Sequence, residues 1–563
     1  MRPPFLLAAL SALVLNACYS AGDGKAPPLE ELYFPTGLAL DDVRDADGLP
    51  QPPRFLYVAS SDFDLQFRSA ALVSYDLDLL RALVPRNCVS DADCEGNTVC
   101  DVPGVSADAS RVPSYFCVDS VTLDPCGALG ARDDADRLLY PGRCNSIDPN
   151  DPQDGSPSLL VDKVGIGAFA TNVIWRKQPV EMDAPVPEFP SRLFLPVRGD
   201  ATLHWIDLKD GHFHCGQETS DDGISCDDRH RSGESISDNL DQLRQAPEPF
   251  ALDATADGKY VAITNQTQGS VSLYANDWSF NGGPKLVSVL SGLPQAPVGI
   301  AVVPAPVLPT GLTSAPGFLV SYRNAAQIDL LRVRSDADDT GTQLKDYTRF
   351  ALTRAGTVPI TTNSVGFDSR GIVIDDAERV ADYEACGCDA SKADCAAAPG
   401  CLTAVHQPAV YVASRSPSSL LVGALTADVG YLSGTNDLPS FPESIAMQAG
   451  PSRVILGMVK VRSALGKETD AFGRYDLERR VFVVCFDSRR IFIYDPKRRV
   501  IDSIVNTGRG PYALVVDDVR GLAYVAHFTD SYLSVISLDQ RFPQSYATIV
   551  ASIGAPTPPR TSK

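Results

Sequence analysis

The sequence predicts an all-β fold, and three observations support it. The chain of 563 residues contains 42 glycines and 43 prolines, a density that suits many short strands joined by turns better than helices. A unit of three strands recurs along the chain, most clearly at 510–538. Candidate outer, fourth strands lie at 285–290, 500–505 and 546–550. Units of short strands that cannot bury their faces alone stack radially, so we expect a β-propeller.

Each unit begins with an apolar strand after a turn, continues with a strand rich in Tyr, Val and Ala, and ends with an alternating strand. The second strands start near Phe55, Leu193, Tyr260, Phe318, Val410, Val481 and Leu522. The third strands start near Ala71, Thr202, Ser270, Gln327, Ser419, Arg490 and Tyr532. The count predicts seven blades over 33–553, while irregular second, fifth and sixth units leave six or eight open. No strand exchange that would close the ring is visible, and a pair of β-sandwiches is the alternative architecture.

A short motif supports the propeller. Tyr-Val-Ala recurs at 57–59, 411–413 and 524–526, and Ala-Asp-Gly precedes Lys-Tyr-Val-Ala at 259–262. These motifs resemble the YVTN-repeat β-propeller family, and units one, three and seven match it best. The resemblance implies a propeller and leaves the activity open, because lactonases and quinoprotein-like dehydrogenases share the fold with binding proteins.

The first residues predict a secretory signal peptide at 1–17. Arg2 precedes an apolar run from residue 5 to residue 15, which is shorter than the roughly 20 residues needed to span a bilayer. The run ends in Leu-Asn-Ala-Cys at Cys18. This resembles the lipobox of bacterial lipoproteins and implies cleavage before Cys18 and lipidation of its sulfur. An ordinary signal peptide with a chance cysteine is the alternative.

A lipidated Cys18 would anchor the chain in the bacterial cell envelope, because more than one acyl chain makes membrane binding stable. Tyr19, and not an aspartate, follows Cys18, so the resemblance to sorted lipoproteins implies the outer membrane. The small, polar and Pro-rich residues 18–32 predict a flexible tether, and 554–563 a C-terminal tail. We therefore expect the chain to bind the membrane through the lipid on Cys18.

Besides Cys18, thirteen of the 14 cysteines remain, in local groups of six, two and four with one left over. Even groups in an exported chain predict disulfides within each group. The candidates are Cys88, Cys94, Cys100, Cys117, Cys126, Cys144, Cys215, Cys226, Cys386, Cys388, Cys395 and Cys401. Cys485 lies in an apolar strand and is predicted to be a buried free thiol.

The cysteine groups lie in three insertions, at 86–150 after the first blade, at 210–241 and at 381–406. The first is interpreted either as a recognition knob or as a rigidified loop. The second contains His212, His214 and His230, which raises a metal site as a hypothesis, but a polar loop is the favoured interpretation. The third has zinc-like ligand types, and an oxidising compartment favours disulfides there. No metal is predicted.

In a propeller, the ends of the second strands surround the central channel. Polar side chains at these ends are the candidate ligand-binding residues, namely Arg198, Asn265, Arg323, Arg415 and His527. Guanidinium groups clamp carboxylate or phosphate in bidentate fashion, so we expect a pocket for an anionic ligand, a glycan or a peptide. The alternative is that the arginines form salt bridges with Asp62, Asp200 and Asp487.

No catalytic residues or cofactor are predicted, because the sequence has no nucleophile elbow, phosphate loop or metalloprotease motif. The net charge of −21 disfavours nucleic acid as a partner. The sequence therefore predicts a lipid-anchored, non-enzymatic module that binds or scaffolds a protein, peptide or glycan. The alternatives are a propeller enzyme of lactonase or quinoprotein-dehydrogenase type, and a structural envelope component.

Overall fold

The computed structural model describes residues 25–557 except 45–49, 89, 95–97, 102–115, 122–123, 152–156, 180–186, 221–222, 280–281, 305–315, 336–349, 361–366, 386–405, 426–437 and 471. The signal peptide and Cys18 lie outside the described residues, as do Cys386, Cys388, Cys395 and Cys401. In the part of the chain that the structure describes, no helix has the length and apolar character needed to cross a bilayer.

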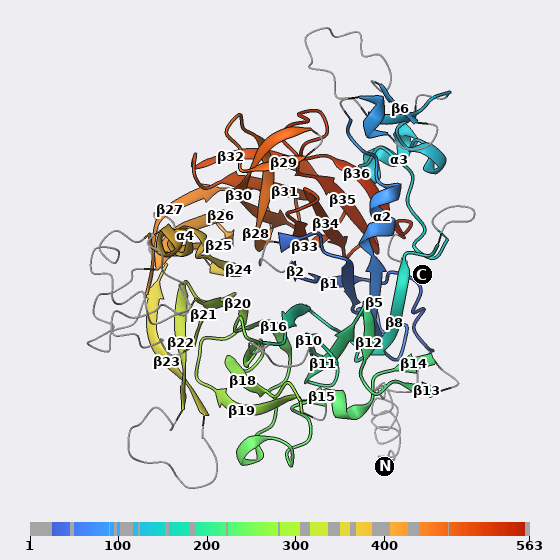
Figure 1. The fold of residues 1–563 in the computed structure, drawn as a ribbon. Coiled ribbons are helices and arrows are strands. Elements are labelled where there is room, and N and C mark those ends of the chain that lie inside the picture. The colour runs from blue at the N-terminus through green and yellow to red at the C-terminus, as the bar shows by residue number, and fades with distance from the viewer. Residues whose placement is uncertain are drawn as a thin grey trace, which may run out of the picture.

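Seven antiparallel sheets surround a central channel and form a seven-bladed propeller (Figure 1). Blade one contains β1 (Pro35–Leu40), β4 (Phe55–Ser60), β5 (Ala70–Asp76) and β8 (Leu160–Ile166). Blade two contains β9 (Ile174–Lys177), β10 (Ser191–Val197), β11 (Thr202–Lys209) and β12 (His212–His214). Blade three contains β16 (Pro249–Ala254), β17 (Tyr260–Asn265), β18 (Ser270–Asn276) and β19 (Pro284–Leu290).

The next four blades repeat this order. Blade four contains β20 (Pro297–Val303), β21 (Gly317–Tyr322), β22 (Gln327–Ser335) and β23 (Phe350–Pro359). Blade five contains β24 (Phe367–Asp375), β25 (Ala409–Ser416), β26 (Ser418–Leu425) and β27 (Pro439–Ala446). Blade six contains β28 (Pro451–Arg462), β30 (Gly473–Cys485), β31 (Arg490–Asp495) and β32 (Val500–Asn506). Blade seven contains β33 (Pro511–Asp517), β34 (Leu522–His527), β35 (Tyr532–Ser537) and β36 (Ile549–Ile553).

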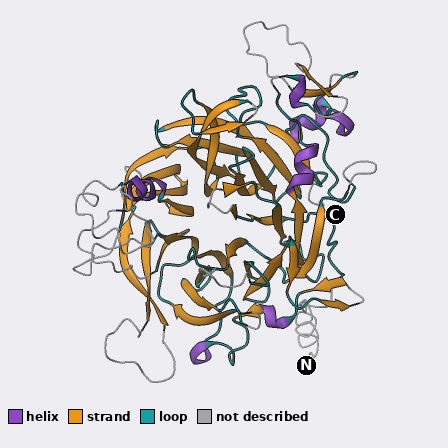
Figure 2. Cartoon of the chain, viewed as in Figure 1, coloured by secondary structure: helices purple, strands orange, loops and turns teal. Residues whose placement is uncertain are grey.

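Short helices and strands lie outside the four main strands of each blade, and Figure 2 shows the helices around the outside of the ring of strands. The α-helices are α2 (Leu77–Leu83), α3 (Asp134–Leu139) and α4 (Ala377–Ala385). Single 3-10 turns lie at Asp91–Asp93, Gly127–Leu129, Asp228–His230 and Leu240–Gln242. The remaining short strands are β2 (Val43–Arg44), β3 (Pro50–Gln51), β6 (Thr98–Asp101), β7 (Phe116–Asp119), β13 (Glu218–Ser220), β14 (Gly223–Ser225), β15 (Arg231–Ser232) and β29 (Glu468–Asp470).

The Tyr-Val-Ala motif forms the core of the propeller because a second strand packs against a neighbouring blade on each face. Successive side chains of a strand point to opposite faces. Val58 packs in one cluster with Tyr524 of blade seven, while Tyr57 packs in another with Leu193 of blade two. All six residues of β4 and of β34 are buried. The seven predicted second strands and seven predicted third strands are present, although the second strand of blade six, β30, begins at Gly473 and not near Val481 as predicted.

The ring closes without a strand exchange, because each blade takes its four main strands in chain order. The sequence left this closure open. Strand β1 packs against β33, and the Phe34 backbone N–H donates to the Ser531 hydroxyl at 3.1 Å. Ile147 then bridges to Ile553 in parallel fashion, with Gly554 N–H donating to the Ile147 carbonyl at 2.8 Å. The first insertion therefore helps to hold blade one against blade seven.

The first insertion, residues 86–150, lies inside blade one and does not follow it, which corrects the sequence prediction. Strand β8 comes after the insertion and pairs with β5 as the outer strand of that blade. Its sequence, Leu-Val-Asp-Lys-Val-Gly-Ile, alternates weakly and does not stand out as a strand. We call residues 86–150 the knob, which projects beside β36 in Figure 1.

The predicted outer strand at 546–550 is also displaced. Strand β36 runs from Ile549 to Ile553, because the backbone turns at Ala547. Ala547 has a φ of 57°, in the left-handed region that interrupts a strand. The predicted strands at 285–290 and 500–505 correspond to β19 and β32.

The second insertion is a structural staple between two blades. It supplies β12 to blade two, and its hairpin β13–β14 extends the sheet of blade one, where Ser225 pairs with Gly165. Its histidines have separate partners: His212 faces Asp162, His230 faces Asp227, and His214 packs against Phe189 with ring centres 4.7 Å apart. His214 and His230 line one cavity. Among the described residues, a cluster with metal-ligand spacing occurs at Cys88, Cys94 and Cys117, whose sulfurs are all committed to disulfides.

Four disulfides close the first two insertions. They join Cys88 to Cys100, Cys94 to Cys117, Cys126 to Cys144, and Cys215 to Cys226. These pairings confirm disulfides within each of the two groups, and Cys485 is buried and free as predicted. Four local disulfides indicate a chain that folds outside the cytoplasm.

Candidate ligand-binding site

The three predicted arginines lie at the channel mouth, which we define as the face where second strands connect to third strands. Each lies beside a carboxylate. Arg198 donates to Glu248 at 2.9 Å, Arg415 pairs with Asp487, and the Arg323 guanidinium is 4.0 Å from Asp368. The salt-bridge interpretation expected Asp487 among the partners, and Asp487 does pair with Arg415. Arg198 and Arg323 instead lie beside Glu248 and Asp368, which belong to the segments that enter blades three and five.

The other two predicted residues, Asn265 and His527, lie between blades and are fully buried. The Asn265 amide donates to the hydroxyls of Ser270 and Ser272 at 3.2 and 2.9 Å. The His527 ring stacks on Tyr532 with ring centres 4.2 Å apart. Both residues are the last of a second strand, where cross-strand pairing still turns their side chains inward. Neither side chain is exposed to a ligand at the channel mouth.

Burial of His527 makes the stability of blade seven dependent on pH. Burial lowers the pKa of His527 to about 3 from an ordinary value of 6.5. The unfolded chain takes up a proton near pH 6.5 and the folded chain only near pH 3, so stability is complete above the first value and falls as pH drops toward the second. We expect His527→Gln to flatten this fall. Urea unfolding at neutral pH and within the window measures it, and an unchanged pH dependence would contradict it.

Aromatic side chains fill the channel mouth. Phe63 lies 5.2 Å from Phe528 between ring centres, and Phe528 lies 5.9 Å from Tyr512. Phe34 and Phe169 pack against the same group. Phe34, Phe63 and Phe169 come from loops and Phe528 follows a second strand, whereas Tyr512 lies in the first strand of blade seven, β33.

Arg453 crosses the channel below these rings. Its guanidinium lies over Tyr512, 5.1 Å from the ring centre, and donates to the carbonyl of Thr171 at 3.3 Å. Arg453 belongs to β28 of blade six, whereas Thr171 precedes blade two, so the contact spans the ring. These groups cover the centre of the channel mouth, while a cavity of about 530 Å³ remains beside it, lined by Leu65, Phe169 and Asp200 among others.

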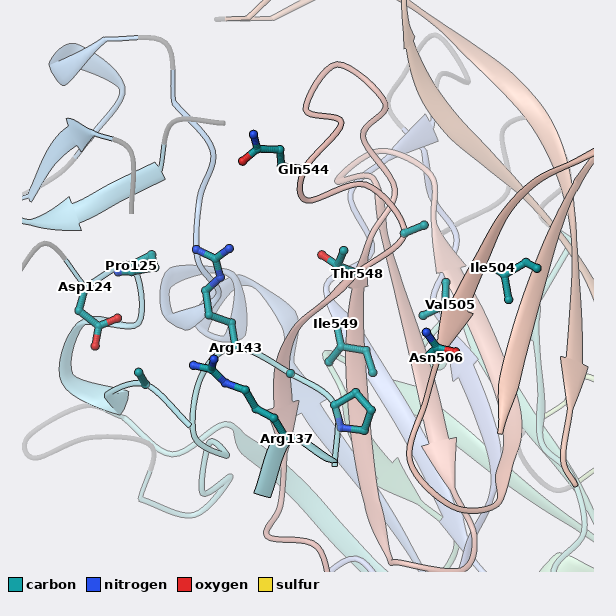
Figure 3. A pocket seen from close by; sticks show the side chains of 14 residues that line it. Asp124, Pro125, Arg137, Arg143, Ile504, Val505, Asn506, Gln544, Thr548 and Ile549 are labelled. Atoms are coloured by element: carbon teal, nitrogen blue, oxygen red, sulfur yellow. The ribbon is translucent and has the colours of Figure 1, made fainter. Parts of the chain in front are cut away.

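A cavity of about 800 Å³ lies between the knob and the outer strands of blades six and seven. We call it the knob groove. The knob contributes Pro125, Arg137 and Arg143 to its lining, and the blades contribute Ile504 of β32 and Ile549 of β36. Figure 3 shows both arginines on the knob side of the groove, with Asp124 beyond them and the strands that carry the isoleucines on the opposite side. The groove thus combines two cations and one carboxylate, Asp124, with walls that are partly apolar and partly polar.

The knob positions its arginines through local structure. Helix α3 carries Arg137 and is capped by Asp133, whose side chain accepts a hydrogen bond from the backbone N–H of Asp136 at 2.8 Å. The disulfide from Cys126 to Cys144 fixes the segment next to Arg143. These contacts hold both guanidinium groups on one side of the groove.

Buried Arg132 joins the knob to blade seven. Its guanidinium donates to the Tyr140 carbonyl at 2.6 Å, to the Ser146 hydroxyl at 3.2 Å and to the Ser552 hydroxyl of β36. A buried guanidinium with several acceptors tolerates little displacement. The two walls of the groove are therefore held in register.

The electrostatics of the groove favour an anion. Burial and the nearby charge of Arg137 lower the pKa of Arg143, and the charge of Asp124 opposes this lowering without reversing it. The Arg143 guanidinium also lies over the Phe116 ring, 4.8 Å from its centre. Arg137 contacts Asp134 at 3.4 Å on the exposed surface. Two like charges at one groove are relieved by a bound carboxylate or phosphate.

These features define a class of protein: a seven-bladed propeller with a disulfide-stabilised knob that forms a cationic groove at the rim. The chain matches no protein family model and no curated protein sequence. Among solved structures, it is similar in chain course to the periplasmic gluconolactonase PpgL of Pseudomonas aeruginosa, with 9% identity over 84% of this chain and 86% of that chain and a TM-score of 0.38.

Two further structures are similar at the same level. A protein from Lactobacillus plantarum has 12% identity over 85% of this chain and 86% of its own, with a TM-score of 0.39. Sqt1 of Saccharomyces cerevisiae has 7% identity over 95% and 90%, with a TM-score of 0.40. Likeness at these scores carries no argument about activity, so function must be argued from the site.

Proposed function

We propose that this chain is a lipoprotein anchored through Cys18, whose propeller binds a protein partner through an extended acidic segment lying in the knob groove. The observation that supports the proposal most directly is the pair of guanidinium groups, Arg137 and Arg143, at a partly apolar cavity of about 800 Å³. A carboxylate of the segment would pair with the guanidinium groups. Apolar side chains beside it would contact Ile504 and Ile549.

The backbone of β32 favours an extended segment over a compact ligand. This strand is the outer edge of blade six, and an edge strand presents a row of N–H and C=O groups to an added strand. Peptide recognition by strand addition takes affinity from such groups and specificity from side-chain pockets. The groove would then read the side chains while β32 binds the backbone.

The surface around the groove suits a macromolecular partner. Large hydrophobic side chains are exposed on the knob, where Val121, Leu138 and Leu139 are 87%, 85% and 56% exposed. Val500 and Ile504 on β32 are 47% and 42% exposed. Exposed apolar side chains on both elements that form the groove are consistent with a protein-binding surface. On a chain with a net charge of −21, the cationic groove also orients an acidic segment.

Replacing both groove arginines with glutamine is expected to weaken peptide binding by tenfold or more. The probe is a displayed library of random peptides, selected on the full chain. Selected sequences are expected to combine Asp or Glu with Leu, Ile, Val or Phe. Loss of charge-assisted hydrogen bonds, each worth about 1.5–3 kcal/mol, predicts the weaker binding of Arg137→Gln/Arg143→Gln. Titration of the selected peptides measures it.

The matched control is Arg415→Gln, which removes a rim cation that already pairs with Asp487. It is expected to leave peptide affinity unchanged. Selection without acidic residues, or equal affinity for the double variant and the parent, would refute the groove as the site. Turnover of gluconolactone by the same preparation would instead favour the lactonase alternative.

A further inference from the structure

The described chain begins against the channel mouth. Lys25 bridges to Phe67, and the Arg68 N–H donates to the Lys25 carbonyl at 3.1 Å. Phe67 and Arg68 belong to the loop between β4 and β5 of blade one, a connection from a second to a third strand. The seven residue steps from Cys18 to Lys25 span at most about 25 Å when extended. A lipid on Cys18 would therefore lie within that distance of this loop.

The same loop exposes two large apolar side chains, Phe63 at 53% and Leu65 at 42%. Phe63 rests on rings that already fill the channel mouth, with Phe169 and Phe528 at 6.1 and 5.2 Å between ring centres. It therefore has no apolar space to withdraw into. Outside a membrane, its exposed face stays in water.

The turn fixes the backbone that carries both side chains, of which Leu65 also lines a cavity of about 530 Å³ together with Phe67 and Phe169. Leu65 has a φ of 53°, and its N–H donates to the Asp62 carbonyl at 3.1 Å. The Asp62 carboxylate accepts from the Phe67 N–H at 3.2 Å. The Asp64 carboxylate accepts hydrogen bonds from the Tyr33 hydroxyl and from the Gln66 side-chain amide. Four intramolecular hydrogen bonds thus organise a loop whose apolar side chains face solvent.

We propose that the channel mouth faces the bilayer, with Phe63 and Leu65 in the interfacial layer of the membrane that holds the lipid of Cys18. This inference rests on the anchoring part of the proposed function. Aromatic and apolar side chains on a tethered surface gain by leaving water at that depth. With a net charge of −21, general electrostatic attraction to anionic lipid does not orient the chain, so the lipid and this apolar loop must do so.

The orientation has a consequence for binding. A membrane against the channel mouth excludes soluble ligands from Arg198, Arg323 and Arg415. The knob groove lies at the outer strands of blades six and seven, on the rim of the ring (Figure 1). A partner would then approach from the side of the propeller.

Depth-dependent quenching tests the proposal. The full lipidated chain is reconstituted in vesicles of phosphatidylethanolamine and phosphatidylglycerol with brominated acyl chains. Phe63→Trp places a fluorophore on the proposed membrane face. Leu465→Trp is the matched control, because Leu465 is 89% exposed in the connection between β28 and β30, which lies on the opposite face. We expect emission from Phe63→Trp to be quenched several-fold more than that from Leu465→Trp, after subtraction of the parent chain.

Flotation of the same vesicles separates the possible failures. If the parent chain floats and Cys18→Ala does not, equal quenching at the two positions overturns the orientation and leaves the anchor intact. If the parent chain does not float, both the anchor and the orientation are overturned. Peptide binding at the knob groove is measured independently and does not depend on either result.

Discussion

Replacing Arg192 with methionine is expected to lower the free energy of unfolding by about 3–5 kcal/mol, because it leaves a buried carboxylate without its partner. Arg192 of β10 and Asp207 of β11 are buried and form an ion pair at 2.7 Å. The guanidinium also donates to the Asn276 side chain at 2.6 Å and to the Asp277 carbonyl at 2.8 Å in blade three. It lies over Trp205 at 4.2 Å. One side chain therefore joins two blades.

Denaturant unfolding of the full chain measures this loss. Arg415→Met is the control, since Arg415 pairs at the channel mouth with Asp487, whose side chain is 47% exposed, and solvent-screened pairs contribute about 0–1 kcal/mol. The double variant Arg192→Met/Asp207→Leu is expected to recover part of the loss, because removing both charges leaves no buried ion unpaired. Equal effects of Arg192→Met and Arg415→Met would contradict the prediction.

The sequence predicts the blades well and this interaction not at all. A second strand such as β34 carries its signal locally, since alternating side chains must satisfy two neighbouring blades. In contrast, Arg192 follows Ser191 at the start of a strand, where a charged residue suggests an exposed position. Its acceptor Asn276 is 84 residues away in sequence. No local pattern encodes that distance.

The candidate site shows the same division. The even cysteine groups predict a disulfide-closed knob, and its three disulfides are present. The place where the knob packs is set by Arg132 and Ile147, which contact Ser552 and Ile553. Arg143 and Ile504 are therefore far apart in the sequence and line the same groove only because the ring is folded. The position of Asn265 and His527 at strand ends predicts that they bind a ligand. The prediction is wrong, because the cross-strand register turns both side chains inward.

The disulfide between Cys126 and Cys144 should control the groove without controlling the propeller. It joins residues 18 positions apart, and closing a loop of this size stabilises a folded segment by about 3 kcal/mol. We expect Cys126→Ser/Cys144→Ser to release the segment that carries Arg137 and Arg143. Peptide affinity should fall at least as far as in the double arginine variant. Hydrogen exchange should rise within 124–144 and not in β34.

The control is Cys88→Ser/Cys100→Ser, which removes another knob disulfide whose cysteines, unlike Cys126 and Cys144, are not next in sequence to residues that line the groove. It should retain peptide binding. The propeller itself should survive both changes, because Ile147 still pairs with Ile553 and β1 still packs against β33. Retained peptide affinity in Cys126→Ser/Cys144→Ser would show that binding does not need the arginine geometry. Loss of protection throughout the blades would show instead that the knob is part of the ring closure and not a module attached to it.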